Sequence, residues 1–139
     1  MQLVLTTGSG RQPACVLKGV LRHQNLIAWQ RADDLFVRLH RLSSERFPST
    51  ERFELASQLR RAAYSVAANI VEGMAFRSAR QRTHFLNIAE ASLAEVAYCV
   101  HVAHRLGYIG ANEFVELESH IRSVFGPLSG LLRSTNEAN

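Results

Sequence analysis

Residues 55–73 read LASQLRRAAYSVAANIVEG, and this stretch decides the fold. Its apolar side chains recur three and four positions apart, at Leu55, Ala56, Leu59, Ala62, Ala63, Val66, Ala67 and Ile70. That spacing places them along one face of an α-helix. Because several of them are alanines, a neighbouring helix can approach this face closely. The pattern predicts a helix over residues 51–72, with Gly73 in the left-handed conformation that commonly follows a helix end.

The same period appears in three further segments of the chain. It predicts helices over residues 26–46, 79–106 and 111–133. Pro48 ends the first of them, because proline disfavours helical geometry in the residue before it. Ser78 and Gln81 match a capping box at the start of the next, and Gly107 ends it. Gly126-Pro127 interrupts the last segment, so we expect a kink or a break there.

Four long helices with short connections pack as antiparallel neighbours. The sequence therefore predicts an all-α fold, an up-and-down antiparallel four-helix bundle over residues 26–133. Residues 1–25 show no helical period and are interpreted as a flexible, poorly ordered N-terminal arm or a mis-assigned start. Residues 134–139 are expected to form a tail.

The amino-acid composition indicates which partners and which location to expect for the protein. The chain has 139 residues and a formal net charge of +4, and arginine supplies fifteen of its sixteen basic side chains. Arginine binds phosphate in a bidentate manner, which favours a phosphate-rich partner, although surface arginine is also often simply solvated. Cys15 and Cys99 form no paired motif, which favours a reducing cytoplasm. No apolar run is long enough for a membrane span, so no membrane partner is expected.

Motifs for catalysis and metal binding are missing from the sequence. Di-metal bundles carry Glu-x-x-His pairs, and no glutamate of this chain has histidine at that spacing. His101 and His104 lie three positions apart, but we interpret them as histidines at the edge of an apolar face. The sequence contains neither a nucleophile elbow nor a phosphate-binding glycine loop. We therefore expect no catalytic residue, no metal and no cofactor, and a protein that is not an enzyme.

A polar stripe runs along the otherwise apolar helix predicted for residues 51–72. Its members are Arg61, Ser65, Asn69 and Glu72, at steps of four, four and three. Buried polar groups of this kind need hydrogen-bond partners. Together with Glu95 they predict a structural polar seam that fixes helix register, either inside the bundle or at a contact between subunits. A ligand site is the alternative.

Basic residues gather in sequence around the corner between the second and third predicted helices. Five arginines occupy 23 positions there: Arg60, Arg61, Arg77, Arg80 and Arg82. They predict a surface for RNA or DNA at one end of the bundle. The alternative is a solvated bundle end, where Glu72 and Glu90 offset part of the charge.

Two segments carry a family resemblance. Residues 59–73 (LRRAAYSVAANIVEG) and 85–95 (FLNIAEASLAE) resemble the signature of the four-helix-bundle family of the 23S rRNA intervening-sequence proteins. Phe47-Pro48, followed by Glu51, also resembles the first turn of that family. The matching family positions are Arg60, Arg61, Ser65, Asn69, Glu72, Gly73, Ser92 and Glu95. The N-terminal arm and Gly126-Pro127 depart from the pattern.

The resemblance implies a small bacterial protein of a family whose members mostly lack an assigned activity. Related accessory bundle proteins of diversity-generating retroelements form ring-like pentamers and bind nucleic acid and a reverse transcriptase. By that analogy we expect a homopentamer with RNA or DNA as partner, and a protein partner such as a reverse transcriptase. A fold family does not transfer function by itself. The leading expectation is a non-enzymatic oligomer that binds nucleic acid, and the alternative is a structural or adaptor protein.

Overall fold

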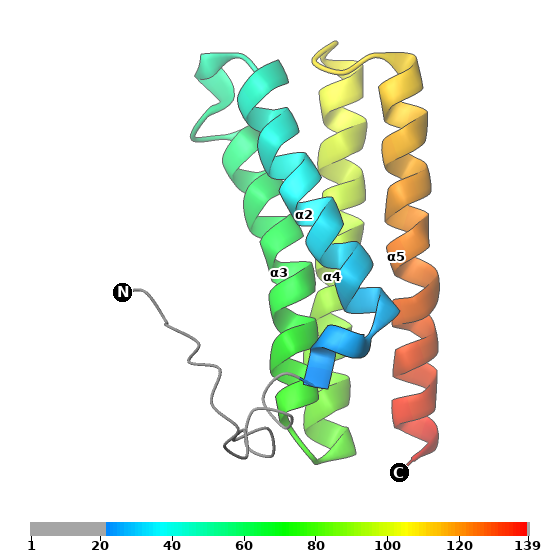
Figure 1. Ribbon diagram of the computed structural model, residues 1–139. Coiled ribbons are helices and arrows are strands. Elements are labelled where there is room, and N and C mark those ends of the chain that lie inside the picture. Colours follow the sequence, from blue (N-terminus) through cyan, green and yellow to red (C-terminus); the bar gives the residue numbers. More distant parts are fainter. Residues whose placement is uncertain (1–21, 139) are drawn as a thin grey trace, which may run out of the picture.

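The computed structural model describes residues 22–138, and the predicted arm lies outside them except for its last four residues. Four long helices form an antiparallel bundle (Figure 1), as predicted. They are α2 (Ile27–Arg46), α3 (Leu55–Ala75), α4 (Ala79–Arg105) and α5 (Ala111–Glu137). Two short 3-10 turns, η1 (Arg22–Asn25) and η2 (Ser49–Glu51), precede α2 and α3. The described part of the chain contains no strand.

The helices follow one another around the bundle in chain order, and α5 closes the circle against α2. The side formed by α2 and α3 therefore lies opposite the side formed by α4 and α5 (Figure 1). The apolar stripes face the shared interior, where the largest fully buried side chains include Leu35, Leu39, Leu59, Ile70, Leu86, Leu117 and Leu128. Burying one such side chain contributes about 1.5–3 kcal/mol. Among the helices that the structure describes, none is long and apolar enough to cross a lipid bilayer.

The predicted start of α3 at residue 51 is wrong, because the helix begins at Leu55. Glu54 has φ −114° and ψ −104°, which breaks the helical path after η2. The Glu51 carboxylate instead accepts a hydrogen bond from the Leu55 backbone N–H at 3.1 Å. Tyr108, from the connection before α5, donates to the other carboxylate oxygen at 3.1 Å. Glu51 thus accepts a hydrogen bond from the first turn of α3. It also links the connection between α2 and α3 to the connection between α4 and α5 at this end of the bundle.

The predicted role of Gly73 as a left-handed residue after the helix end is also wrong. Gly73 is buried inside α3, which continues to Ala75. A Cβ at Gly73 would lie 3.1 Å from the Cβ of Phe85 and 3.4 Å from the carbonyl oxygen of Arg82. The position therefore favours glycine because α4 crosses it closely, whereas among residues 22–138 it is Gly107 that has a positive φ, +79°.

Both ends of α4 follow the sequence signals. The Ser78 hydroxyl accepts a hydrogen bond from the Gln81 backbone N–H at 3.4 Å, which caps the first turn. At the other end, the N–H of Gly107 bonds the carbonyl of His104 and the N–H of Tyr108 bonds the carbonyl of Ala103. This pair of bonds is the Schellman arrangement, which needs a left-handed residue such as Gly107.

We predicted a kink or a break at Gly126-Pro127. The break is wrong, since α5 runs without interruption from Ala111 to Glu137, four residues beyond its expected end, and the kink stays a prediction. Proline cannot donate to the carbonyl four positions earlier, which belongs to Ser123. In this bundle the Arg31 guanidinium of α2 donates to that carbonyl at 2.9 Å. Gly126 also carries no Cβ to meet the proline ring, so it keeps helical geometry more readily than other residues would.

The bond between Arg31 and Ser123 predicts a specific energetic coupling. Arg31→Met keeps the apolar stem but removes the donor, and it should lower the free energy of unfolding by about 1 kcal/mol. In a Pro127→Ala background the new backbone N–H satisfies Ser123, so Arg31→Met should cost much less. Urea unfolding of the two single variants and the double variant measures this coupling. Equal costs in both backgrounds would contradict the compensation.

Candidate nucleic-acid interface

Three of the five predicted arginines meet at the corner between α3 and α4. Arg77 lies in the connection, and Arg80 and Arg82 lie in the first turn of α4. Arg77 and Arg80 are exposed, and neither forms an ion pair with any residue from 22 to 138. We call Arg77, Arg80 and Arg82 the corner arginines.

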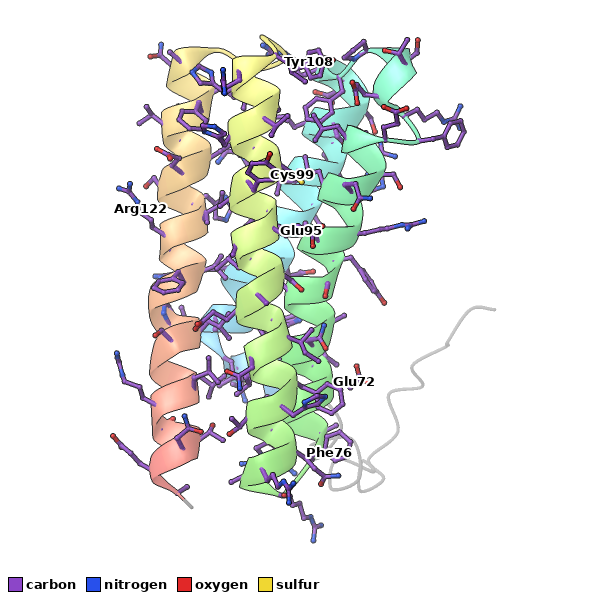
Figure 2. The ribbon with its side chains drawn as sticks, turned by 180° about the vertical axis from the view of Figure 1, so that it is seen from behind. Glu72, Phe76, Glu95, Cys99, Tyr108 and Arg122 are labelled. Atoms are coloured by element: carbon purple, nitrogen blue, oxygen red, sulfur yellow. The ribbon has the colours of Figure 1, made fainter. Side chains whose placement is uncertain are left out.

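The corner is held in a defined shape by its own contacts. The Arg82 guanidinium donates a hydrogen bond to the backbone carbonyl of Phe76, across the turn. The Phe76 ring stacks on Phe85 with 5.3 Å between ring centroids and 5° between the ring planes. Figure 2 shows Phe76 at this end of the bundle. These contacts fix one corner arginine and leave the other two directed to solvent.

The charges at this corner run against ordinary helix preferences. Helix N-termini carry a partial positive charge and favour acidic side chains. The first turn of α4 contains no acidic residue but contains Arg80, and Arg77 lies two positions before the helix begins at Ala79. The backbone N–H groups of a first turn also lack partners within the helix. The electrostatic potential at the corner is therefore positive, and a bound anion would lower the electrostatic energy there.

The other two predicted arginines lie elsewhere. Arg60 is fifteen residues before the end of α3, which is roughly 22 Å from the corner at 1.5 Å per residue. It donates to the hydroxyls of Ser43 at 2.9 Å and Ser44 at 2.8 Å, and so ties α3 to α2. Arg61 is exposed next to it. The five arginines thus do not form the single end patch that their closeness in sequence predicted.

The predicted polar seam is present in its central part. The hydroxyls of Ser65 in α3 and Ser92 in α4 lie 2.7 Å apart. The Asn69 side-chain amide donates to the Ser65 hydroxyl at 2.9 Å and to the Ser65 carbonyl at 2.8 Å. Ser92 is 8% exposed, whereas Ser65 and Asn69 are partly exposed, so the network lies at the boundary between the interior and the surface. The hydrogen-bond partner that α4 supplies to Ser65 is therefore Ser92, and not the expected Glu95.

The charged members of the predicted seam lie outside this network. Arg61, Glu72 and Glu95 are exposed, and their side chains form no hydrogen bond or ion pair with another described residue. Figure 2 shows Glu72 and Glu95 on the side of the bundle formed by α3 and α4. The part of the prediction that places these charges at a subunit contact stays a prediction.

The serine pair predicts unequal costs for two conservative substitutions. Ser65→Ala removes the partner of the Ser92 hydroxyl and one of the two acceptors of the Asn69 amide, so it should lower the free energy of unfolding by about 1–2 kcal/mol. Ser92→Ala leaves Asn69 bonded and should cost less. The double variant should lose less free energy of unfolding than the two single variants together, because removing both hydroxyls leaves neither one without its partner. Urea titration measures all three, with Ser57→Ala, a partly exposed serine in the first turn of α3, as control. Additive costs would contradict the pairing.

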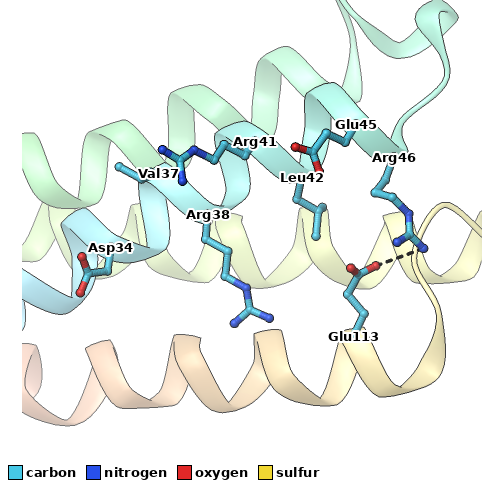
Figure 3. A pocket seen from close by; sticks show the side chains of 8 residues that line it. All are labelled: Asp34, Val37, Arg38, Arg41, Leu42, Glu45, Arg46 and Glu113. Atoms are coloured by element: carbon cyan, nitrogen blue, oxygen red, sulfur yellow. Dashed lines mark ion pairs between the residues drawn. The ribbon is translucent and has the colours of Figure 1, made fainter.

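A second charged region lies between α2 and α5 (Figure 3). Unlike the corner, it carries basic and acidic side chains in equal number. Its lining residues are Asp34, Val37, Arg38, Arg41, Leu42, Glu45, Arg46 and Glu113. Arg46 pairs with Glu113 at 3.5 Å, and Arg38 pairs with Glu116 at 3.2 Å. The lining carries three arginines and three carboxylates, so it offers a phosphate little net attraction. Burial, and then the neighbouring Arg38, lower the pKa of His120 beside it.

The side chains within residues 22–138 that could bind a metal ion, and the thiol of Cys99, bear on metal and nucleophilic chemistry. No group of three or more His, Cys, Asp or Glu side chains in that range could hold a metal ion. Cys99 is buried, and burial followed by the charge of Glu95 raises the pKa of its thiol. A protonated thiol is a poor nucleophile and a poor metal ligand. Figure 2 shows Cys99 on α4 near Glu95.

Comparison with known proteins places this geometry in a family. The model of the family described as 23S rRNA-intervening sequence protein matches residues 24–130, which is most of the chain and nearly all of the bundle. The chain belongs to this family. The resemblance inferred from residues 59–73 and 85–95 is therefore confirmed for the intervening-sequence family. No curated protein matches the chain. In this member of the intervening-sequence family, the corner arginines are the most concentrated unpaired charge among the predicted site residues.

Proposed function

We propose that this chain is a non-enzymatic, self-assembling bundle protein that binds RNA or DNA through its corner arginines. The observation that supports this most is the exposure of Arg77 and Arg80 without an ion-pair partner among the described residues, beside the first turn of α4. Guanidinium groups bind phosphate in a fixed geometry, and first-turn N–H groups add to the attraction. A cytoplasmic location belongs to the same proposal.

Self-assembly would strengthen such binding without any new contact. One corner offers only three arginines, and a single small patch binds nucleic acid weakly at physiological salt. Copies held together, a homopentamer by analogy with the related retroelement proteins, would present several corners to one strand. Each corner bound then raises the effective concentration of the next. This coupling makes the oligomer part of the proposed function.

An adaptor role is the second candidate, and exposed apolar side chains favour it. Phe53 is 84% exposed and Tyr98 is 67% exposed, and both would be covered by a protein partner. A partner such as a reverse transcriptase belongs to this candidate. Capture of that partner in a form resistant to nuclease would favour an adaptor, and capture that nuclease abolishes would favour nucleic acid as the link.

The test uses the purified full chain with labelled RNA, single-stranded DNA and duplex DNA. Light scattering gives the number of subunits, and fluorescence anisotropy gives affinity at about 50 mM and about 200 mM salt. We expect an oligomer whose affinity falls at least tenfold between the two conditions, because each phosphate contact releases counterions. Absence of binding at the lower salt would overturn the nucleic-acid proposal. A metal or cofactor retained through purification would contradict the non-enzymatic part.

A further inference from the structure

A pocket of about 390 Å³ lies where the connection between α2 and α3 meets the two helices. Its lining residues are Ser43, Ser44, Phe47, Pro48, Ser49, Arg52, Ala56 and Arg60. Figure 1 shows this connection at the end of the bundle opposite the corner between α3 and α4. The pocket is therefore separate from the corner arginines.

Arg60 is held in one orientation by two serines of α2. Its Nε donates to the Ser43 hydroxyl at 2.9 Å, and its Nη2 donates to the Ser44 hydroxyl at 2.8 Å. Each hydroxyl in turn donates to the His40 backbone carbonyl, at 3.0 Å and 3.1 Å. A guanidinium has more N–H donors than these bonds use, so others remain for a ligand. Arg60 is thus positioned in advance to bind an anion.

The charged side chains that line the pocket are all basic. Arg52 and Arg60 supply two guanidinium groups, and no carboxylate is among the lining residues. Neither arginine forms an ion pair with another residue from 22 to 138. Arg60 is half-buried, which weakens the screening of its charge by water and salt. Two like charges in one pocket repel each other, and a bound anion would stabilise both.

The acidic side chains nearest in sequence lie outside this pocket. Glu45 lines the charged region between α2 and α5 instead. The Glu51 carboxylate accepts hydrogen bonds from Leu55 and Tyr108. Glu54 is exposed and is not among the lining residues. The local charge of the pocket is therefore set by its two arginines.

Two exposed side chains add donors to those of Arg60. The Arg52 guanidinium lies over the Phe53 ring, 5.4 Å from the ring centroid. This contact uses no oxygen acceptor, so the N–H groups of Arg52 remain for a ligand. Ser49 adds a hydroxyl. Two guanidinium groups and a hydroxyl are a donor set suited to the several acceptor oxygens of a phosphate group.

We propose that this pocket binds a dianionic phosphate group, either as inorganic phosphate or as the monoester group of a small molecule. A phosphate monoester carries a charge of about −1.5 to −2 at pH 7, which matches two arginines. An internal phosphodiester of RNA or DNA carries a single negative charge and continues as a chain on both sides, so it fits a concave pocket less well. The volume leaves room for an organic group beside the phosphate. This site goes beyond the proposed nucleic-acid binding and does not depend on it.

Isothermal titration calorimetry of the purified full chain in phosphate-free buffer tests the ligand class. We expect inorganic phosphate, ribose 5-phosphate or both to bind with a Kd of about 1 mM or lower. Ribose, which lacks the phosphate, and dimethyl phosphate, a diester with one charge, should bind at least about tenfold more weakly. Tighter binding of ribose 5-phosphate would identify a monoester as the ligand, and tighter binding of inorganic phosphate would identify the free ion. Absence of binding by both, or equal binding of dimethyl phosphate, would overturn the proposal.

Three variants locate the site. Arg52→Gln removes one arginine of the pocket and should weaken phosphate binding by about tenfold or more. Ser44→Ala keeps every charge but removes one acceptor that orients Arg60, so it should weaken binding by about threefold. Arg41→Gln makes the same charge change as Arg52→Gln at an exposed arginine of α2 that does not line the pocket. It should change the affinity by less than about twofold.

The variants also give the results that would contradict the site. Unchanged affinity in Arg52→Gln would place the bound phosphate elsewhere on the protein and overturn the proposal. Equal weakening by Arg41→Gln and Arg52→Gln would indicate attraction to the overall charge, and would overturn it as well. Unchanged affinity in Ser44→Ala would overturn the positioning of Arg60 by the serines. Arg41, Ser44 and Arg52 are all exposed, so each variant should fold, and circular dichroism checks this.

Discussion

Replacing Gly73 with valine should lower the free energy of unfolding by about 2–3 kcal/mol, within the range measured for overpacked interiors. The Cβ alone would stand 3.1 Å from the Cβ of Phe85, an atom fixed to the backbone of α4. The methyl groups of valine add to that crowding, and the two helices must move apart. Alanine at this position should still cost about 1 kcal/mol, although alanine favours helices over glycine. Urea unfolding followed by circular dichroism measures both.

Gly130 provides the control, because it is a helical glycine with space around it. A Cβ there would meet only the end of the Arg133 side chain at 3.9 Å. Gly130→Ala should therefore raise the free energy of unfolding by about 0.5–1 kcal/mol, opposite in sign to Gly73→Ala. If alanine raises the free energy of unfolding at both positions, α4 can move away from α3 at little cost. That result would contradict the claim that close packing requires Gly73.

The double substitution Arg77→Gln with Arg80→Gln should weaken binding of RNA or DNA by roughly 10- to 100-fold at low salt. It removes two phosphate contacts, so the slope of log affinity against log salt should flatten by about 1.4 to 1.8. Stability should hold or rise slightly, because two positive charges leave the N-terminus of α4. Anisotropy titrations over several salt concentrations, with thermal unfolding in parallel, measure the two effects.

Arg41→Gln with Arg105→Gln is the matched control for the corner. Both arginines are exposed, and both lie toward the end of the bundle opposite the corner. The control lowers the net charge by the same two units, so it separates local contacts from overall charge. It should change affinity less than threefold, by our expectation for the loss of long-range attraction alone. Equal weakening by both double variants would move the binding surface away from the corner.

The helices were predictable because their apolar positions repeat along the sequence at the helical period. The bounds of α2 and α4 come within a residue of prediction for the same reason, helped by local signals at Pro48, Ser78 and Gly107. The start of α3 was missed because Glu51 bonds Leu55 and Tyr108 rather than joining the helix. The role of Gly73 and the break at Pro127 were predicted wrongly because the deciding contacts, with Phe85 and Arg31, come from other helices. Sequence signals fail where a distant element supplies the deciding contact.

The candidate site was predictable in composition and less so in arrangement. Arginines 77, 80 and 82 are close in sequence across a tight connection, so they are also close in space. In the sequence Arg60 resembles the corner arginines, but its guanidinium donates hydrogen bonds to Ser43 and Ser44 of α2. Only the structure shows that these serines lie beside it. The seam was found from the period of Ser65 and Asn69. Its partner Ser92 could have been found as a lone polar residue within the apolar stripe of α4.

The central claim is that nucleic acid contacts this bundle at the α3–α4 corner. Ultraviolet cross-linking of the native protein to bound RNA, followed by mass spectrometry of the linked peptides, locates that contact without any substitution. The account predicts cross-links concentrated in residues 76–85, where Phe76 and Phe85 lie beside the corner arginines. Cross-links confined to α2 and α5, or none under conditions where binding is measured, would contradict it.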